Sequence, residues 1–389
     1  MKKFISTLLL SFAPLAIFSQ EATKKGLDER VNDWFYPIAV WWEGFVLTSI
    51  PVGDFSIPIV LILLVCGALF FTIYFGFVQF VRFPLSINVV RGKYDEMEKV
   101  AIGDNEPSTE KPMVNIEDGG DIVGTIKDES QDGEVSHFQA LATAVSGTVG
   151  LGNIAGVAIA IAVGGPGATF WMIVCGLLGM ATKFVECTLA VAYRDVEADG
   201  TVFGGPMYYL SRGMRGTALA PVGKVLAVIF AIMCVGASFG GGNAFQSNQA
   251  AQQISSMFNL SGGSTGLIIG AILAFFVAIV ILGGIKSIAK VTEKIVPFMA
   301  LLYVIACLII IFANISFIGP AIQQIIAGAF TPAAGLGGLL GVLIVGFQRA
   351  AFSNEAGAGS AAIAHSAVKT KFAASEGLVA LLEPFIDTV

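Results

Sequence analysis

Residues 137–163 constrain the fold most, because they could cross a bilayer yet contain several helix-breaking glycines. A crossing takes about 20 residues, and this run reads HFQALATAVSGTVGLGNIAGVAIAIAV, with Gly147, Gly150, Gly152 and Gly156 around its middle. Each glycine costs a helix interior roughly 1 kcal/mol relative to alanine. Unwound backbone in a membrane must face protein or a wet cavity, because lipid offers its polar groups no partner. The run therefore predicts an interrupted crossing whose freed peptide groups bind something small.

The composition predicts an all-α polytopic membrane protein. Hydrophobic residues make up 55% of the 389 residues and charged residues 13%, whereas soluble proteins carry about 25% charged residues. Without a basic patch interleaved with aromatic residues, no nucleic-acid partner is expected. The two histidines, His137 and His365, have no triad-like neighbours, so an enzyme is not expected. The cysteines stand singly in apolar runs, which indicates neither a transition-metal site nor a disulfide framework. These are Cys66, Cys175, Cys187, Cys234 and Cys307.

The N-terminal region predicts a signal peptide followed by an interfacial segment. In residues 1–20, Lys2 and Lys3 precede an apolar run, which is typical of a secretory signal, although an uncleaved anchor is the alternative. Residues 21–54 contain several tryptophans and predict a segment at the outer membrane interface. Further apolar crossings are predicted at 55–80, 165–193, 223–256, 264–285, 295–315 and 336–352, with another starting near 376.

Charged loops predict the orientation. Lys and Arg concentrate in 81–136 and 194–222 and near Lys286, whereas the intervening loops, such as 257–263 and 316–335, have none. By the positive-inside rule, 81–136 is a cytoplasmic loop of a plasma (inner) membrane protein whose mature N-terminus lies outside. The polar part of that loop, from residue 94 onward, has no apolar face and is expected to be flexible.

A second glycine-rich crossing resembles the first. It continues into GFQRAAFSNEAGAGS, where Asn354 and Glu355 appear at membrane depth. Two interrupted segments at corresponding positions of two repeats predict a site near the middle of the bilayer. The alternative is that the glycines only allow close helix packing, but packing does not explain Asn153, Asn354 and Glu355.

Other polar residues in the crossings leave alternatives open. Lys183 and Glu186 share one helix face and could form a proton relay, although a structural pair that snorkels to the interface is favoured. Arg349 with Glu355 has the same ambiguity, and a gate or structural pair is favoured. The polar cluster at 240–249 could be a helix end at the interface or a substrate contact.

Three long motifs give the chain a recognisable resemblance. They read SHFQALATAVSGTVGLGNIAGVAIAIAVGGPGATFWM, GMATKFVECTLAVAYR and RAAFSNEAGAGSAAIAHSAVKT. The sequence resembles the alanine or glycine:cation symporter family, to which sodium:alanine symporters belong. The resemblance implies sodium-coupled uptake of alanine or glycine by alternating access. It also implies a LeuT-type fold of two inverted five-helix repeats.

On that family pattern, 55–80 is an extra N-terminal helix, 137–315 is the first repeat, and 336–389 begins the second. About four further crossings are expected beyond Val389, so the second repeat is expected to be incomplete within this sequence.

The resemblance also implies substrate contacts. These are Gly150, Leu151 and Gly152 in the unwound stretch, Gln246, and Phe352 as a lid over a small side chain. Position 151 is often threonine in the family, so leucine here leaves the choice between alanine and glycine open.

Physical reasoning separately predicts an ion site. Exposed N–H groups at a half-helix can hold the carboxylate of a zwitterion, and sodium prefers carbonyl, amide and hydroxyl oxygens. Unwound carbonyls over Ala144–Thr148, with Asn153 and Asn354, supply such oxygens, and no cofactor besides Na⁺ is expected. The close alternative is a proton-coupled small amino-acid carrier, and a channel or membrane sensor is more distant. The sequence leaves the oligomeric state open.

Overall fold

The computed structural model describes residues 27–52, 55–94, 133–197, 200–260, 265–330 and 338–389. By contacts the chain forms a smaller unit, Met1–Thr48 with Ala244–Val277, and a larger one, Ser49–Asn243 with Ala278–Val389. The predicted signal peptide at 1–20 and most of the predicted loop 81–136 lie outside the described residues.

Long apolar helices dominate the described residues, which confirms an all-α membrane protein. Three of these helices are long and apolar enough to cross a bilayer: Gly167–Ala192, Ala220–Met257 and Gly284–Ala313. A bent pair, His137–Thr148 with Gly152–Gly164, passes the same test when its halves are taken together. Shorter apolar helices lie at Ile59–Tyr74, Thr265–Ile281 and Ile315–Phe330.

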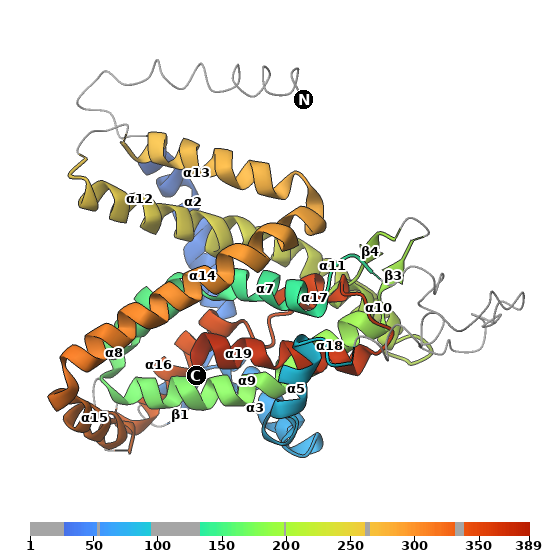
Figure 1. The fold of residues 1–389 in the computed structure, drawn as a ribbon, viewed down its shortest axis with the longest axis horizontal. Helices are drawn as coiled ribbons and strands as arrows, with labels where there is room; N and C mark the ends of the chain where they lie inside the picture. Colours follow the sequence, from blue (N-terminus) through green and yellow to red (C-terminus); the bar gives the residue numbers. More distant parts are fainter. Residues whose placement is uncertain (1–26, 53–54, 95–132, 198–199, 261–264, 331–337) are drawn as a thin grey trace, which may run out of the picture. The chain divides into compact units, whose positions relative to one another are not determined.

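Helix α9 (Gly167–Ala192) organises the larger unit. Figure 1 shows α9 running beside α16 (Gly338–Asn354) and α19 (Leu382–Thr388). It also packs against α3 (Ile59–Tyr74), α15 (Ile318–Phe330), α17 (Ser360–Ser366) and α18 (Ala373–Ala380). Glycines on α9 permit this packing, since a Cβ on Gly179 would lie 2.9 Å from the Ala356 Cβ and one on Gly176 would lie 2.8 Å from the Thr388 Cβ.

The first predicted crossing, 55–80, starts and ends differently from expectation. Strand β1 (Ser49–Val52) pairs antiparallel with β2 (Phe55–Pro58), so α3 begins only after Pro58. The helix stops before Gly76, whose φ of +59° is left-handed and favours glycine. Short helices α4 (Val78–Val81) and α5 (Phe83–Val90) follow.

The predicted loop 194–222 contains regular structure. Strand β3 (Asp195–Val196) pairs with β4 (Val202–Phe203), and α10 (Pro206–Gly213) leads into α11 (Ala220–Ala237). The π-helical turn η5 (Ser238–Ala244) follows α11 and includes the start of the polar cluster at 240–249. Strands of 2 residues and a helix of 8 residues are too short to show a clear hydrophobic period. The sequence pattern of this segment therefore predicted a loop.

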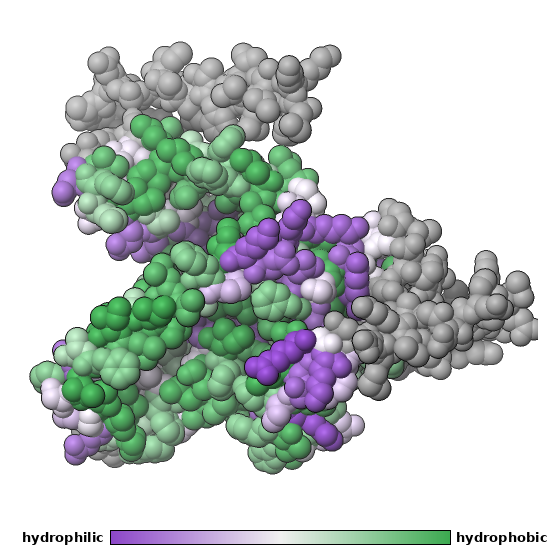
Figure 2. Space-filling view, viewed as in Figure 1, coloured by the Kyte–Doolittle hydropathy of each residue, from purple (hydrophilic) through white to green (hydrophobic). Residues whose placement is uncertain are grey.

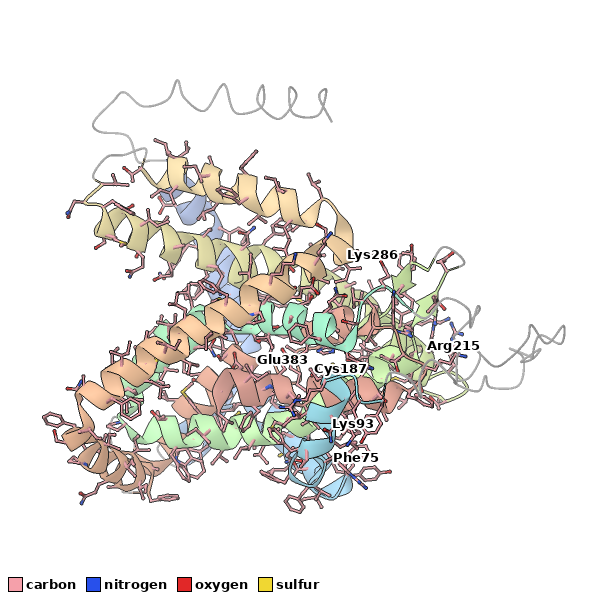
Figure 3. All side chains as sticks on the ribbon, in the orientation of Figure 1. Phe75, Lys93, Cys187, Arg215, Lys286 and Glu383 are labelled. Atoms are coloured by element: carbon pink, nitrogen blue, oxygen red, sulfur yellow. The ribbon has the colours of Figure 1, made fainter. Side chains whose placement is uncertain are left out.

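Helix α14 (Gly284–Ala313) corrects the expected loop around Lys286. Lys286, Lys290 and Lys294 lie within this helix, although the prediction placed them between crossings. A helix of this length reaches about 45 Å at 1.5 Å per residue, beyond the roughly 30 Å of hydrocarbon. Its lysines can therefore lie in water while its apolar part crosses the membrane. Lys286 is labelled near the start of α14 in Figure 3.

Residues 316–335 were expected to form a loop. The structure instead has the 3-10 turn η6 (Ile315–Phe317) and then α15. Most large hydrophobic side chains of α14 are exposed, including Phe298, Leu301, Ile309 and Phe312. The space-filling view shows this apolar cover along α14 (Figure 2). Exposed apolar side chains of this extent fit a lipid environment.

The smaller unit consists of α2 (Leu27–Val46), α12 (Phe245–Met257) and most of α13 (Thr265–Ile281). Helix α2 contains the three tryptophans of the predicted interfacial segment, Trp34, Trp41 and Trp42, and all three are exposed. Amphipathic indole rings of this kind favour a membrane interface.

Candidate functional site: two interrupted helices

The predicted break in 137–163 is confirmed. Helix α7 (His137–Thr148) starts with a capping box between Ser136 and Gln139. The backbone becomes extended at Val149, and a π-helical turn, η4 (Gly152–Gly156), leads into α8 (Val157–Gly164). The two halves are bent by 52°.

Asn153 stabilises this break. Its Oδ1 accepts a hydrogen bond from the Gly150 N–H at 2.7 Å, so one freed backbone donor already has a partner. An amide side chain thus replaces a missing helical hydrogen bond.

The second glycine-rich crossing, predicted at 336–352, is not broken by its own glycines, because α16 runs through Gly341 and Gly346. The interruption follows the end of this helix. Helix α16 ends at Asn354, and Glu355 adopts a left-handed φ of +50° before α17 begins at Ser360. Asn354 Oδ1 accepts from the Ala356 N–H at 3.0 Å, and the Ser360 hydroxyl donates to Glu355. Left-handed backbone is rare outside glycine, so these contacts fix an otherwise disfavoured turn.

The two interruptions meet at Gly152. A Cβ on Gly152 would lie 2.9 Å from Ser353 Oγ and 3.1 Å from Ser353 Cα. Ser353 is the next-to-last residue of α16, and its side chain is buried. Only glycine at 152 allows the first break to lie this close to the end of α16. Gly152 therefore combines the two roles that were set against each other as alternatives: it lies at a helix break, and it allows close helix packing.

Asparagines from both interruptions converge on the last residues of α19. Asn153 Nδ2 donates to the Asp387 carbonyl at 2.6 Å and to Asp387 Oδ1 at 2.9 Å. Asn354 Nδ2 donates to Thr388 Oγ1 at 3.1 Å, and that hydroxyl donates to Asp387 Oδ2 at 2.7 Å. The result is a polar cluster in which a carboxylate, a carbonyl and a hydroxyl join two amide side chains.

The sequence interpretation missed Asp387 and Thr388. The available signal was a polar pair, Asp-Thr, one helical turn after Glu383 in an otherwise apolar run. Nothing local in that pair specifies its distant asparagine partners.

The remaining predicted site residues lie in different surroundings. Leu151 is half-buried and caps η4, whereas Phe352 on α16 is 52% exposed. Thr148 is buried, and its hydroxyl donates to the carbonyls of Ala144 and Val145 at 3.4 Å. Regular helix continues to Thr148, so the backbone unwinds from Val149 rather than from Ala144. Gln246 belongs to α12, in the smaller unit.

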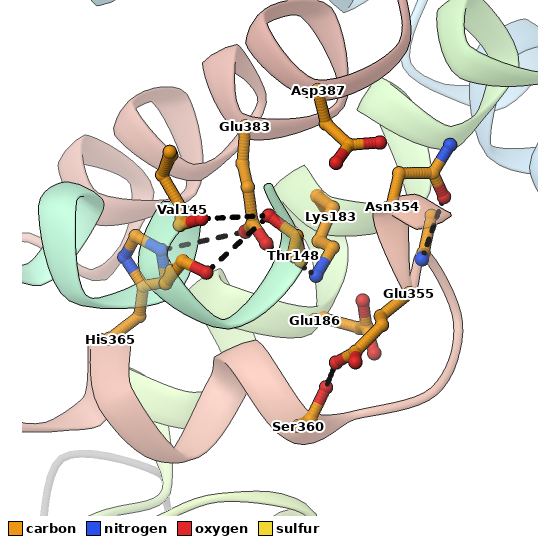
Figure 4. A network of polar contacts seen from close by, with 12 residues as sticks. Val145, Thr148, Lys183, Glu186, Asn354, Glu355, Ser360, His365, Glu383 and Asp387 are labelled. Atoms are coloured by element: carbon orange, nitrogen blue, oxygen red, sulfur yellow. Dashed lines mark hydrogen bonds and ion pairs between the residues drawn. The ribbon is translucent and has the colours of Figure 1, made fainter. Parts of the chain in front are cut away.

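Lys183 has a different partner from the one expected. Its Nζ donates to Glu383 Oε1 of α19 at 3.1 Å, and both side chains are 0% exposed. The expected pair with Glu186 that snorkels to the interface is therefore wrong. The cause is tertiary, because α19 packs against α9 and brings Glu383 to the lysine. Figure 4 shows Glu383 between Lys183 and His365.

The other acidic residues near the second break bind local groups. Glu186 Oε2 accepts from the Gly357 N–H at 3.2 Å. Glu355 binds Ser360, and the ion pairs found among the described residues do not join it to Arg349. Both carboxylates therefore help to shape the loop between α16 and α17.

These features define a multi-pass, all-α membrane protein whose two interrupted helices meet at their breaks. The sequence model described as "Sodium:alanine symporter family" matches residues 113–389. The chain belongs to this family.

Curated relatives agree with this assignment. The sodium/alanine symporter AgcS of Methanococcus maripaludis is 42% identical over 333 residues, which cover 85% of this chain and 65% of AgcS. The putative sodium/proton-dependent alanine carrier protein YrbD of Bacillus subtilis is 42% identical, covering 69% of this chain and 53% of its own length. The probable sodium/glutamine symporter GlnT of the same organism is 38% identical, covering 66% and 51%. The chain therefore spans only part of the length of these relatives.

Proposed function

We propose that the protein containing this chain is a sodium-coupled symporter that moves alanine or glycine into the cell by alternating access, with a LeuT-type inverted-repeat fold. The meeting of the two breaks at Gly152 and Ser353 is the observation that carries this proposal. Interrupted helices that meet inside a membrane protein are the usual site of small zwitterions and their coupling ions. Gly150, Leu151 and Gly152 supply the unwound backbone for the substrate, with Phe352 as a further contact.

The ion site in this proposal extends the set predicted from sequence. Thr148, Asn153 and Asn354 remain candidate ligands, and Ala144 contributes through the carbonyl that Thr148 contacts. Asp387 and Thr388 join them because both asparagines bind this pair. Carboxylate, carbonyl, amide and hydroxyl oxygens are the donors that a hard cation prefers. An ion held there ties α19 to both breaks, and linkage then couples ion binding to substrate binding.

Uptake of labelled alanine by the complete protein in proteoliposomes tests the proposal. An inward sodium gradient should drive uptake, and replacement of sodium by choline should abolish it. Asp387→Asn should raise the sodium concentration for half-maximal uptake at least about tenfold, since loss of even an outer-shell partner costs 10–100-fold in metal affinity. Asp195→Asn is the matched control, because the Asp195 carboxylate binds Arg212 and not the asparagines of the two breaks. An unchanged sodium requirement in Asp387→Asn would remove Asp387 from the ion site.

A proton-coupled amino-acid carrier is the second candidate. It is supported by the buried contacts of His137 and His365 with Glu376. A pH gradient without sodium would drive alanine uptake in that case. The sodium proposal expects no uptake under that condition, so one pair of gradients separates the two. The inner-membrane location and the outside N-terminus remain predictions of this proposal.

A further inference from the structure

A group of buried titratable side chains lies in the larger unit, and the proposed substrate and sodium sites do not use it. This row consists of His137, Lys183, Glu186, His365, Glu376 and Glu383. Glu376 of α18 is 0% exposed and contacts one imidazole with each oxygen. Its Oε2 contacts Nδ1 of His137, the first residue of α7, and its Oε1 contacts Nδ1 of His365 on α17. One carboxylate thus joins three helices.

The other nitrogen of His365 has no hydrogen-bond partner. His365 Nε2 lies 3.9 Å from Glu383 Oε2, and neither atom has a hydrogen bond within the described structure. A neutral imidazole that donates from Nδ1 to Glu376 leaves Nε2 as an acceptor. Two buried acceptors then face each other, which is unfavourable. If a proton binds between these two atoms, His365 Nε2 becomes a hydrogen-bond donor and Glu383 Oε2 accepts from it.

The charges of the row also favour an added proton. With ionised carboxyl groups and neutral imidazoles, Lys183 gives one positive charge against Glu186, Glu376 and Glu383. Three negative charges minus one positive charge leave two uncompensated negative charges. Buried charges in membranes are usually paired, and imidazolium at His365 would halve this imbalance.

One further buried cation lies near His365. Arg194 is 1% exposed, and its guanidinium donates to the carbonyl of the next residue, Ser366, and to those of Val368 and Thr370. Helix α5 packs against α18 and has no titratable side chain. Helix α14 packs against α7, where its Glu293 accepts from Gln139 Nε2 at 2.8 Å. The remaining titratable groups close to these carboxylates are Cys187, Tyr209 and Glu355. Lys183 is paired with Glu383, and the Arg194 guanidinium binds backbone carbonyls, so the contact between His365 Nε2 and Glu383 Oε2 has no donor of its own.

We propose that His365 Nε2 and Glu383 Oε2 form a proton-binding site, and that a proton bound there holds α17 against α19 and slows transport. The proton comes from water and converts the imidazole to imidazolium, with no other bond changed. His137, at 6% exposed, is the most accessible residue of the His–Glu–His contact. This inference rests on the proposed transport function for its effect on rate, but proton binding itself does not depend on transport.

Nitrogen NMR of the complete protein labelled with ¹⁵N-histidine tests the site directly. The ring of His365, assigned by its absence from His365→Asn, should change from neutral to imidazolium as the pH falls between about pH 8 and pH 5. Glu383→Gln should move that midpoint down by about one pH unit or more, because an opposite charge within 4–6 Å favours the charged form by that amount. Glu293→Gln, the matched control on α14, should leave the midpoint unchanged. A midpoint that Glu383→Gln does not move, or a ring in one protonation state throughout, overturns the proposal.

Uptake at equal pH on both sides of the membrane tests the effect on rate. The wild-type rate should fall toward acid with a slope approaching about tenfold per pH unit, the slope of one bound proton. The rate of His365→Asn should be flat over the same range. Equal pH dependence in both proteins refutes the control of transport while leaving the symporter proposal standing. A wild-type protein that takes up no alanine refutes the symporter proposal, and the NMR titration then still decides whether the proton site exists.

Discussion

Replacing Gly152 with alanine tests the contact on which the site depends. The added Cβ would lie 2.9 Å from Ser353 Oγ, 3.1 Å from its Cα and 3.2 Å from its Cβ. The serine hydroxyl can rotate away, but the Cα belongs to the backbone of α16 and cannot. The two interruptions must therefore separate by a few tenths of an ångström.

Overpacking of this kind costs about 1–3 kcal/mol. Gly147 provides a matched control in the same crossing, because a Cβ there meets nothing within 4 Å. Gly147→Ala should gain stability, up to about 1 kcal/mol, since alanine favours a helix interior over glycine. The same chemical change, five residues apart, should therefore change stability in opposite directions.

Thermal unfolding of the complete protein in detergent, followed by tryptophan fluorescence, measures both effects. Gly152→Ala should lower the Tm and reduce sodium-dependent alanine uptake, while Gly147→Ala should raise the Tm or leave it unchanged. Adding Ser353→Gly to Gly152→Ala should recover part of the lost Tm, because it removes two of the three close atoms. If both single variants have the same Tm and uptake, the two breaks do not touch at Gly152 and the site described above is wrong.

Local features of the sequence predicted the break in 137–163 because the causes of that interruption are local. The second break was placed too early, since the glycines within α16 do not interrupt the helix. Glycines near residue 150, with Asn153 to bind a freed amide, suffice to weaken a helix wherever it packs. The turn after Asn354 has the same kind of local cause, namely an asparagine side chain that accepts from the backbone two residues on. The all-helical membrane architecture follows in the same way from long apolar runs.

Partners that lie far apart in the chain could not be predicted. Lys183 and Glu383 are 200 residues apart, and Glu186 is the obvious partner by helical spacing. Asp387 joined the candidate ion site only because α19 places it beside Asn153. The helical start of α14 was missed for another reason, since lysines usually mark a loop even where a helix extends beyond the hydrocarbon.

Two further substitutions test buried charges of the larger unit. Arg194 donates to the carbonyls of Ser366, Val368 and Thr370 and is 1% exposed. Arg194→Lys cannot keep this fork, and each lost hydrogen bond to a charged donor should cost about 1.5–3 kcal/mol, measured as a fall in Tm. Lys183→Met leaves Glu383 buried without its ion-pair partner, which should cost about 3–5 kcal/mol in stability. The double variant Lys183→Met with Glu383→Gln should regain most of that loss, because it removes the unpaired charge as well. Equal Tm values for the Lys183→Met single and double variants would show that Glu383 takes up a proton once Lys183 is removed, and the expected cost of an unpaired buried charge would then be wrong.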